Sequence, residues 1–239
     1  MPLLVHGLLD AAHAAAVDTD ELTLAAEREV DVIVEGDLAA AVSATEALEA
    51  VPTRANLMAH ARVLEQLAGV ATVAPMQFGV IVADHNELAR SVEEQHDRVV
   101  AVLDQLEGHV EFRLRGRYEQ DEVVREVLAD DPRAARLRGD DSFDARMELG
   151  ERVVTGIEDR RDRDREHVLE RLASHISDVA VADVTEPLDA FAVSLLVAVE
   201  HRDLFDEHLE RLGVELAPRL GLELVGPVPP FSFAGAAEA

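Results

Sequence analysis

Hydrophobic and polar positions follow two periods along this chain, one typical of helices and one typical of strands. Apolar residues recur every three or four positions over 54–68 and 84–106, which is the spacing that places them on one face of a helix. Short apolar runs predict strands at 3–8, 31–35, 38–42 and 70–76. Glu35-Gly36-Asp37 predicts a hairpin turn, because glycine accepts the positive φ that a tight turn needs. The first half is therefore expected to be a small α+β unit.

The two predicted helices begin at recognisable caps. Thr53 is placed to cap the first helix, and Asp84 with Glu87 three residues later forms a capping box for the second. The buried positions predicted for the first helix are Leu57, Ala61, Leu64 and Leu67. Those predicted for the second, which ends before Gly108, are Leu88, Val92, Val99, Leu103 and Leu106. The segment 10–29 is predicted to be a loop with one or two helical turns.

The second half follows the order strand, helix, strand, strand, helix, strand. Alternation over 109–118 predicts a strand with one wet face. Its core-facing residues would be Val110, Phe112 and Leu114, and its solvent-facing residues Glu111, Arg113 and Arg115. A helical pattern follows over 121–171, interrupted near Asp131-Pro132 and near Gly139-Asp140. The remaining elements are predicted at 176–184, 190–199, 203–217 and 222–225. This order is that of a ferredoxin-like domain, with an antiparallel sheet and helices on one face.

The predicted fold class is therefore α+β with two domains, 1–107 and 108–239. Residues 190–199 are almost all apolar, which indicates a central strand buried on both faces. The helix over 203–217 is predicted to bury Leu204, Phe205, Leu209, Leu212 and Leu216.

A proline-rich tail follows the last strand. Gly226-Pro227 is predicted to end that strand, because proline has no amide hydrogen for the ladder. Residues 228–230 should continue as stiff polyproline-like chain, with Phe231 and Phe233 pointing the same way. The tail is expected to pack back on its own protein and cover the core. The alternative is that it forms a docking surface for a partner.

Composition narrows the classes of function. The net charge is −27 and all 22 basic residues are arginine, so binding to nucleic acid or to an anionic membrane is disfavoured. The acidity fits either adaptation to high salt or a GC-rich genome. With no cysteine, the chain has no thiolate ligand or thiol nucleophile. No apolar run approaches the roughly 18 residues of a membrane span, and no signal-peptide pattern is present, so a cytoplasmic protein is expected.

The search for chemical sites gives no positive signal for an enzyme. The sequence lacks the glycine-rich phosphate loops, the nucleophile elbow and any His-Glu-x-x-His. His201 and His208 are seven residues apart on one helix, too far for a helical zinc pair, so no metal and no cofactor are predicted. The charged run over 158–166 is interpreted as a solvated helix face, with a strip that orients a partner as the alternative.

Three short motifs stand out along the sequence. One is Gly226-Pro227-Val228-Pro229-Pro230-Phe231-Ser232-Phe233, the second is Val73-Ala74-Pro75-Met76-Gln77-Phe78-Gly79, and the third is Leu4-Val5-His6-Gly7. In this order they resemble the Gly-Pro-x-Pro-Pro-Tyr-Ser-Phe ending, the Val-x-Pro-x-x-Phe-Gly segment and the Tyr-x-Tyr-Gly opening of the gas vesicle protein GvpF/GvpL family. Two departures are Phe231 in place of tyrosine and His6 in place of an aromatic ring.

The resemblance implies an accessory or minor structural protein of gas vesicles with no enzymatic activity. Its expected partners are the hydrophobic shell protein GvpA and other accessory gas vesicle proteins, and its expected location is the vesicle, or the cytoplasm during assembly. The hypothetical partner-binding residues are Pro75, Phe78, Gly79, Gly226, Pro227, Pro229, Pro230, Phe231 and Phe233. Two rival interpretations are a small-molecule sensor built on the ferredoxin-like domain and a metal-dependent hydrolase.

Overall fold

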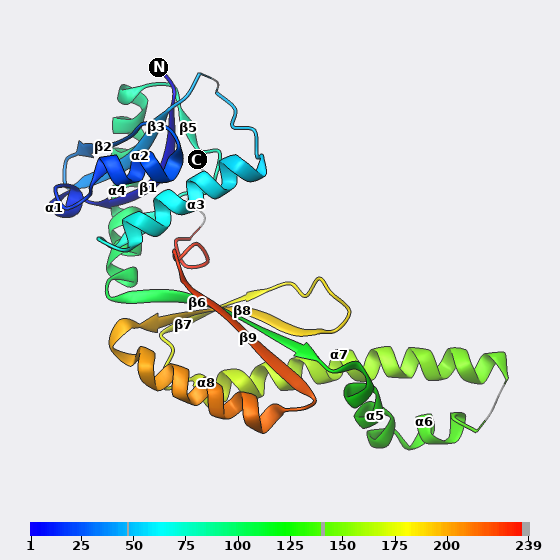
Figure 1. Ribbon diagram of the computed structural model, residues 1–239. Coiled ribbons are helices and arrows are strands. Elements are labelled where there is room, and N and C mark those ends of the chain that lie inside the picture. Colours follow the sequence, from blue (N-terminus) through cyan, green and yellow to red (C-terminus); the bar gives the residue numbers. More distant parts are fainter. Residues whose placement is uncertain (47, 140–141, 236–239) are drawn as a thin grey trace. The chain divides into compact units, whose positions relative to one another are not determined.

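The chain forms two compact units, which are shown in the computed structural model of Figure 1. The structure describes residues 1–46, 48–139 and 142–235. The first unit contains Met1–Glu111 and the segment that begins at Pro227, and the second unit is Phe112–Gly226. The division predicted from the sequence, 1–107 and 108–239, places the tail in the second domain, whereas its contacts group it with the first unit.

The first unit is built on an antiparallel sheet in the order β2-β3-β1-β4, with the short strand β5 also paired to β1. The strands are β1 (Leu3–Asp10), β2 (Val30–Glu35), β3 (Leu38–Ala44), β4 (Val73–Pro75) and β5 (Ile81–Val82). The predicted hairpin joins β2 to β3, and Gly36 takes the expected positive φ of 67°. Pro75 ends a strand at the side of the sheet, where its missing donor costs no ladder bond.

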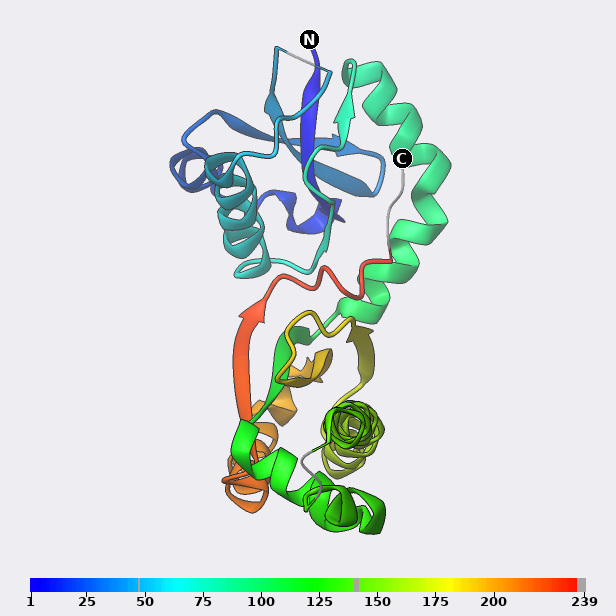
Figure 2. The same cartoon turned by 90° about the vertical axis from the view of Figure 1, so that its right-hand side faces the viewer.

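Helices cover both faces of this sheet, as Figure 2 shows. They are α1 (Ala11–Ala14), α2 (Thr19–Ala26), α3 (Arg54–Ala68) and α4 (His85–Leu106). The apolar stripe of α4 packs on one face, and α2 and α3 pack on the other. Because successive side chains of a strand alternate, Ala40 and Val42 belong to the α4 side and Ala41 to the α3 side. A sheet covered twice needs strands that are apolar throughout, and β3 is buried at six consecutive positions.

Most predicted elements of this unit are confirmed, and three predictions need correction. The strand predicted over 70–76 is limited to β4, Val73–Pro75, because 70–71 form a turn after α3. All five predicted positions of α4 are buried, and Asp84 caps the helix by accepting from the Glu87 amide at 3.0 Å. Leu57 is 43% exposed, because α3 turns His60 and Val63 inward instead. The segment 10–29 holds two helices, since Asp10 and Asp18 each cap a helix with the side chain.

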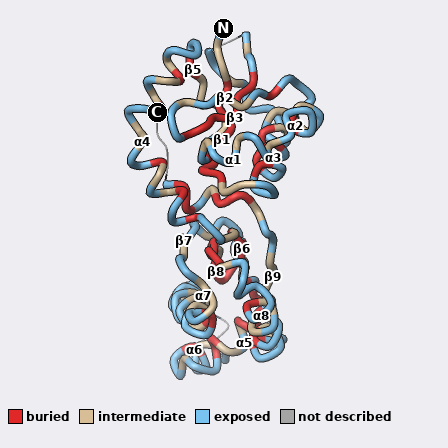
Figure 3. The backbone as a smooth tube through the Cα atoms, turned by 90° about the vertical axis from the view of Figure 1, so that its left-hand side faces the viewer, coloured by how far each residue is buried: buried red, intermediate tan, exposed pale blue. Residues whose placement is uncertain are grey.

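The second sheet has the order β7-β8-β6-β9. Its strands are β6 (His109–Tyr118), β7 (Asp178–Ala182), β8 (Asp189–Ala198) and β9 (Leu220–Val228). Its helices are α5 (Gln120–Asp130), α6 (Pro132–Leu137), α7 (Phe143–Leu172) and α8 (Arg202–Leu216), the last preceded by the 3-10 turn η1 (Val199–His201). The central strand β8 is buried along almost its whole length, as predicted and as the red segment in Figure 3 shows.

The predicted break at Asp131-Pro132 separates α5 from α6, and Pro132 occupies the first turn of α6. The break predicted near Gly139-Asp140 falls partly on Asp140, which lies outside the described residues. Leu204 was predicted to be buried and is 49% exposed. The strand β9 was predicted to stop at Gly226-Pro227 and continues through both residues to Val228. It lies at the edge of the sheet, where proline is tolerated.

The charged run over 158–166 is only partly a solvated face. Asp164 is 8% exposed and accepts hydrogen bonds from the Tyr118 hydroxyl, at 2.7 Å, and from Arg219. Arg160 reaches from α7 to α5, where it pairs with Glu126 and with Asp130. The run therefore ties α7 to its neighbours, because each buried charge meets a charge of opposite sign.

Glycines let elements of the second unit approach closely, and Gly116 on β6 is one example. A Cβ built on Gly116 would lie 2.5 Å from Cε1 of Phe191, whose ring is 1% exposed. A real carbon atom cannot approach that closely, so the ring or the strand would have to move.

We therefore expect Gly116→Ala to destabilise the protein by about 1–3 kcal/mol through overpacking. The matched control is Gly150→Ala on α7, where a Cβ meets no atom within 4 Å, and there alanine should stabilise the helix by about 0.5–1 kcal/mol. Guanidinium unfolding of both variants measures these changes. Equal stability of the two variants would contradict the packing argument.

Candidate functional site

Two histidines in the core of the first unit form its most unusual polar feature. His6 is 1% exposed and His60 is 4% exposed. Their Nδ1 atoms are 2.9 Å apart and their rings stack with centroids 5.0 Å apart. A bulge brings His6 there, because the pairing of β1 with β3 shifts register between Val5 and Gly7 and leaves His6 as an extra residue. A Cβ on Gly7 would lie 2.8 Å from Val73, so only glycine lets β4 pack this closely.

The partners of this pair, together with the neutral form that burial favours for both rings, set the direction of each hydrogen bond in it. The Met76 carbonyl can only accept, so His60 donates to it from Nε2, at 2.9 Å. His60 Nδ1 is then the acceptor, and His6 donates to it from Nδ1. His6 Nε2 in turn accepts from the Ser43 hydroxyl at 2.8 Å. The result is a chain of three hydrogen bonds in which both imidazoles are neutral.

Burial maintains this neutral state. Loss of hydration, the nearby His60 and the charge of Arg28 together lower the pKa of His6 to about 3. Burial also lowers the pKa of His60, against the opposing effect of its bond to the Met76 carbonyl. Protonating His60 would add a second donor opposite His6 Nδ1 at 2.9 Å, and protonating His6 would turn its Nε2 from the acceptor of the Ser43 bond into a donor.

Two aromatic rings from distant segments lie against His60. Phe78 meets it edge-on with ring centroids 5.6 Å apart, and Phe231 lies 6.5 Å away. Both phenylalanines are half-buried. The three motifs of the sequence therefore converge on one place, since one contributes His6, the next contributes Met76 with Phe78, and the tail contributes Phe231. We call His6, His60, Phe78 and Phe231 the ring cluster.

The tail reaches the ring cluster through a turn at 231–233, which corrects the extended segment predicted for Phe231 and Phe233. The amide of Phe231 donates to the Pro229 carbonyl at 2.8 Å, and that of Phe233 donates to the Pro230 carbonyl at 3.2 Å. Glu111 holds the turn, since its carboxylate accepts from the Ser232 amide at 2.9 Å and from the Ser232 hydroxyl at 2.8 Å. Glu111 was predicted to face solvent and is fully buried. Two charge-assisted hydrogen bonds offset part of the cost of burying its carboxylate.

The nine residues proposed from the sequence divide into three groups by exposure. Those with buried side chains are Pro75, Pro229, Pro230 and Phe233. Those that are exposed are Gly79, Gly226 and Pro227. Phe78 and Phe231 are half-buried. They are the two large apolar side chains of the set that pack on the core and also reach the surface.

Sequence reasoning missed the polar partners of this site, namely His6 with His60, Ser43 and Glu111. One signal was present for His60, which lies three residues before Val63 and four before Leu64 on the buried side of α3. Within the described residues, no three His, Asp or Glu side chains are placed to hold a metal ion. His208 lies against His175, with ring centroids 4.1 Å apart and the rings tilted by 44°.

Comparison with known proteins gives consistent matches over almost the whole chain. The family model described as "Gas vesicle synthesis protein GvpL/GvpF" matches residues 5–235. Gas vesicle protein F of Streptomyces sp. (strain CB03234) is 31% identical over 211 residues, covering 85% of this chain and 87% of that protein. Gas vesicle protein L of the same strain is 28% identical over 228 residues, covering 85% of this chain and 82% of that protein.

Two solved structures share the fold. The crystal structure of GvpF from Anabaena sp. PCC7120 has a TM-score of 0.82 at 17% identity and covers 99% of this chain and 97% of its own. That of GvpF from Microcystis aeruginosa has a TM-score of 0.77 at 16% identity, covering 98% of each chain.

The fold and the ring cluster thus define a two-unit protein of mixed helices and antiparallel sheets whose three motifs meet in the first unit. The chain belongs to the gas vesicle GvpL/GvpF family. This membership supports an accessory role in gas vesicles. In the part of the chain that the structure describes, no helix combines the length and the apolar character needed to cross a bilayer.

The buried histidines predict an acid-sensitive fold. Because the folded-state pKa of His6 is about 3 against an ordinary 6.5, the unfolded chain binds more protons below pH 6.5. The contribution of His6 is then complete above pH 6.5 and falls as the pH drops toward 3, by about 1.4 kcal/mol per pH unit. We expect the free energy of unfolding of the native protein to fall more steeply between pH 6.5 and 5 than that of His6→Asn. Parallel pH profiles would contradict the neutral pair.

The clamp on the tail gives a second prediction. Ser232→Ala removes one hydrogen bond to the Glu111 carboxylate, which is worth about 1.5–3 kcal/mol. Amide hydrogen exchange over 228–235 should become faster while exchange in α4 is unchanged. Ser91→Ala is the control, because its hydroxyl accepts only a neutral bond from Gln95. Unchanged exchange in the tail would show that Glu111 does not hold the turn.

Proposed function

We propose that this protein acts during gas vesicle assembly by binding the hydrophobic shell protein GvpA, together with other accessory gas vesicle proteins. The observation that carries the proposal is the convergence of the three family motifs on the ring cluster. A shell subunit that excludes water exposes apolar surface before it is assembled and would aggregate unprotected. A strongly acidic protein with a small apolar contact can hold such a subunit without associating with itself.

Within this proposal, Phe78 and Phe231 are the residues that contact the shell protein, and Gly79 allows close approach. Gly79 is exposed and has a φ of 103°, a conformation that suits glycine. Pro75, Pro229, Pro230 and Phe233 support the contact from below, since they are buried. Gly226 and Pro227 set the course of the chain into the tail.

The proposal also covers the class of the second domain, the domain to which the tail belongs, and the location of the protein. The second unit is taken to be a ferredoxin-like domain, because its elements follow the order β-α-β-β-α-β with the sheet order β7-β8-β6-β9. The tail is taken to be part of the first domain. The protein is expected on the vesicle, or in the cytoplasm while the vesicle is assembled.

The test is capture of co-expressed shell protein by the tagged chain. Phe78→Ser with Phe231→Ser should reduce capture at least tenfold, because both apolar rings leave the contact. The matched control is Leu24→Ser with Val214→Ser, which changes two side chains that are 78% and 79% exposed on other elements. Circular dichroism and the melting temperature establish that each variant is folded.

Two outcomes would contradict the proposal in different ways. Full capture by a folded Phe78→Ser, Phe231→Ser variant would show that the ring cluster does not contact the shell protein. If the native chain captures no shell protein at either low or high salt, the shell protein is not its partner.

A further inference from the structure

A stripe of mostly apolar positions on α7 has the spacing of a helix interface, and all but Ile157, which is half-buried, are exposed. Phe143, Met147, Gly150, Val154 and Ile157 follow one another at alternating steps of four and three residues. This is the spacing of a coiled-coil contact line. Phe143 is 70% exposed, Met147 52% and Val154 56%. We call these five residues the α7 stripe.

The α7 stripe lies on the side of the helix opposite to its packed face. Ala145 is buried, and a Cβ on Gly156 would overlap the side chain of Val127 on α5. Arg152 on the same side bonds to Asp131 at 2.6 Å. These positions differ from those of the α7 stripe by about half a helical turn. Within the described part of the second unit, the N-terminal half of α7 has α5 and α6 on one side, as Figure 1 shows.

A row of carboxylates runs beside the α7 stripe. Asp144, Glu151 and Glu158 recur every seven residues, so they occupy one flank of the contact line on successive turns. All three are exposed. The other flank carries Arg146 and Val153, so the acidic row lies on one side only.

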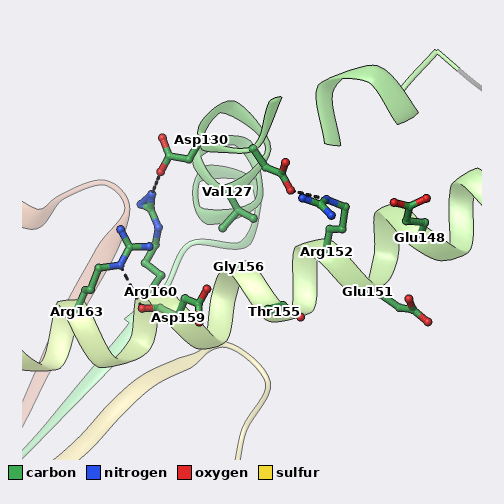
Figure 4. A pocket seen from close by; sticks show the side chains of 11 residues that line it. Val127, Asp130, Glu148, Glu151, Arg152, Thr155, Gly156, Asp159, Arg160 and Arg163 are labelled. Carbon is green, nitrogen blue, oxygen red and sulfur yellow. Dashed lines mark hydrogen bonds and ion pairs between the residues drawn. The ribbon is translucent and has the colours of Figure 1, made fainter. Parts of the chain in front are cut away.

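The acidic flank borders an open cleft of about 920 Å³ between α7 and the preceding helices, shown in Figure 4. Its charged lining consists of five carboxylates, Asp130, Asp131, Glu148, Glu151 and Asp159, and three guanidiniums, Arg152, Arg160 and Arg163. Three of these carboxylates are paired, Asp131 with Arg152, Asp130 with Arg160 and Glu148 with Arg133, and Arg163 donates to the Asp159 carbonyl. The lining therefore keeps only a small excess of negative charge, to which Glu151 of the acidic row belongs.

We propose that the α7 stripe docks an amphipathic helix of a partner protein, with apolar residues at the same alternating spacing and basic residues facing the acidic row. Long arginine or lysine side chains of that helix would extend toward the cleft. A second copy of this chain fits less well. In a parallel pair Arg146 would meet Glu151 of the copy, but each chain carries a net charge of −27, which opposes association.

This inference goes beyond the proposed function, since it concerns residues of the second unit and does not need the shell protein. Its test uses two synthetic helical peptides of about 20 residues, a length of about 30 Å. Both carry leucine at the alternating positions, and the flanking positions are arginine in one peptide and glutamate in the other. Fluorescence anisotropy at physiological salt measures binding to the full chain.

We expect the arginine peptide to bind at least tenfold more tightly than the glutamate peptide. Phe143→Ser with Met147→Ser should weaken that binding at least tenfold, whereas Val181→Ser, at a position that is 60% exposed on β7, should leave it unchanged. Glu151→Arg with Glu158→Arg should reverse the preference between the peptides, and Glu207→Arg on α8 should not.

Equal binding of the two peptides, or binding that survives the Phe143 and Met147 changes, would overturn the proposal. So would self-association in the ultracentrifuge that those same changes abolish, because a second copy would then occupy the α7 stripe. Since no shell protein is present, these results stand apart from the capture experiment on Phe78 and Phe231.

Discussion

The buried carboxylate of Glu111 is the constraint on which the first unit depends most. It has no access to water, so its charge must be met by donors from the protein. Ser232 supplies two of them, and both are available only if the tail turns back at Pro229 and Pro230. The same turn buries Phe233 and brings Phe231 beside His60. A single polar contact thus determines where the last motif lies relative to the first two.

The second constraint is the scarcity of large side chains. Aromatic residues make up 3% of the chain, so most of the core is alanine, valine and leucine. Small side chains leave little tolerance for gaps, and the elements must approach closely. Gly7 against Val73 and Gly116 against Phe191 show this in each unit. The few phenylalanines then matter individually, as Phe112 stacked on Phe205 does in the second core.

Regular periodicity made much of the fold predictable from the sequence. The stripe of α4 and the hairpin at Gly36 follow from local rules that the tertiary structure did not override. The predictions were wrong where burial or strand length depends on a segment that is distant in the sequence. The alternation of strand β6 places Glu111 on its solvent-facing side, but the tail covers that position. Its partner Ser232 lies 121 residues away, and a local sequence pattern does not indicate so distant a contact. The strand β9 passes through Pro227 because it lies at the edge of its sheet, which local sequence does not reveal.

The candidate site was predicted in part for the same reason. The motifs pointed to Phe78 and Phe231, but the histidines that join them depend on a bulge in β1 that brings His6 against α3. The distribution of charge adds a functional argument. Inside the second unit, arginines are consumed by specific partners such as Asp130, Asp131 and Asp189, whereas much of the carboxylate excess lies at the surface. That excess opposes association between copies of the chain, which favours a partner of opposite charge at exposed apolar surface such as the α7 stripe.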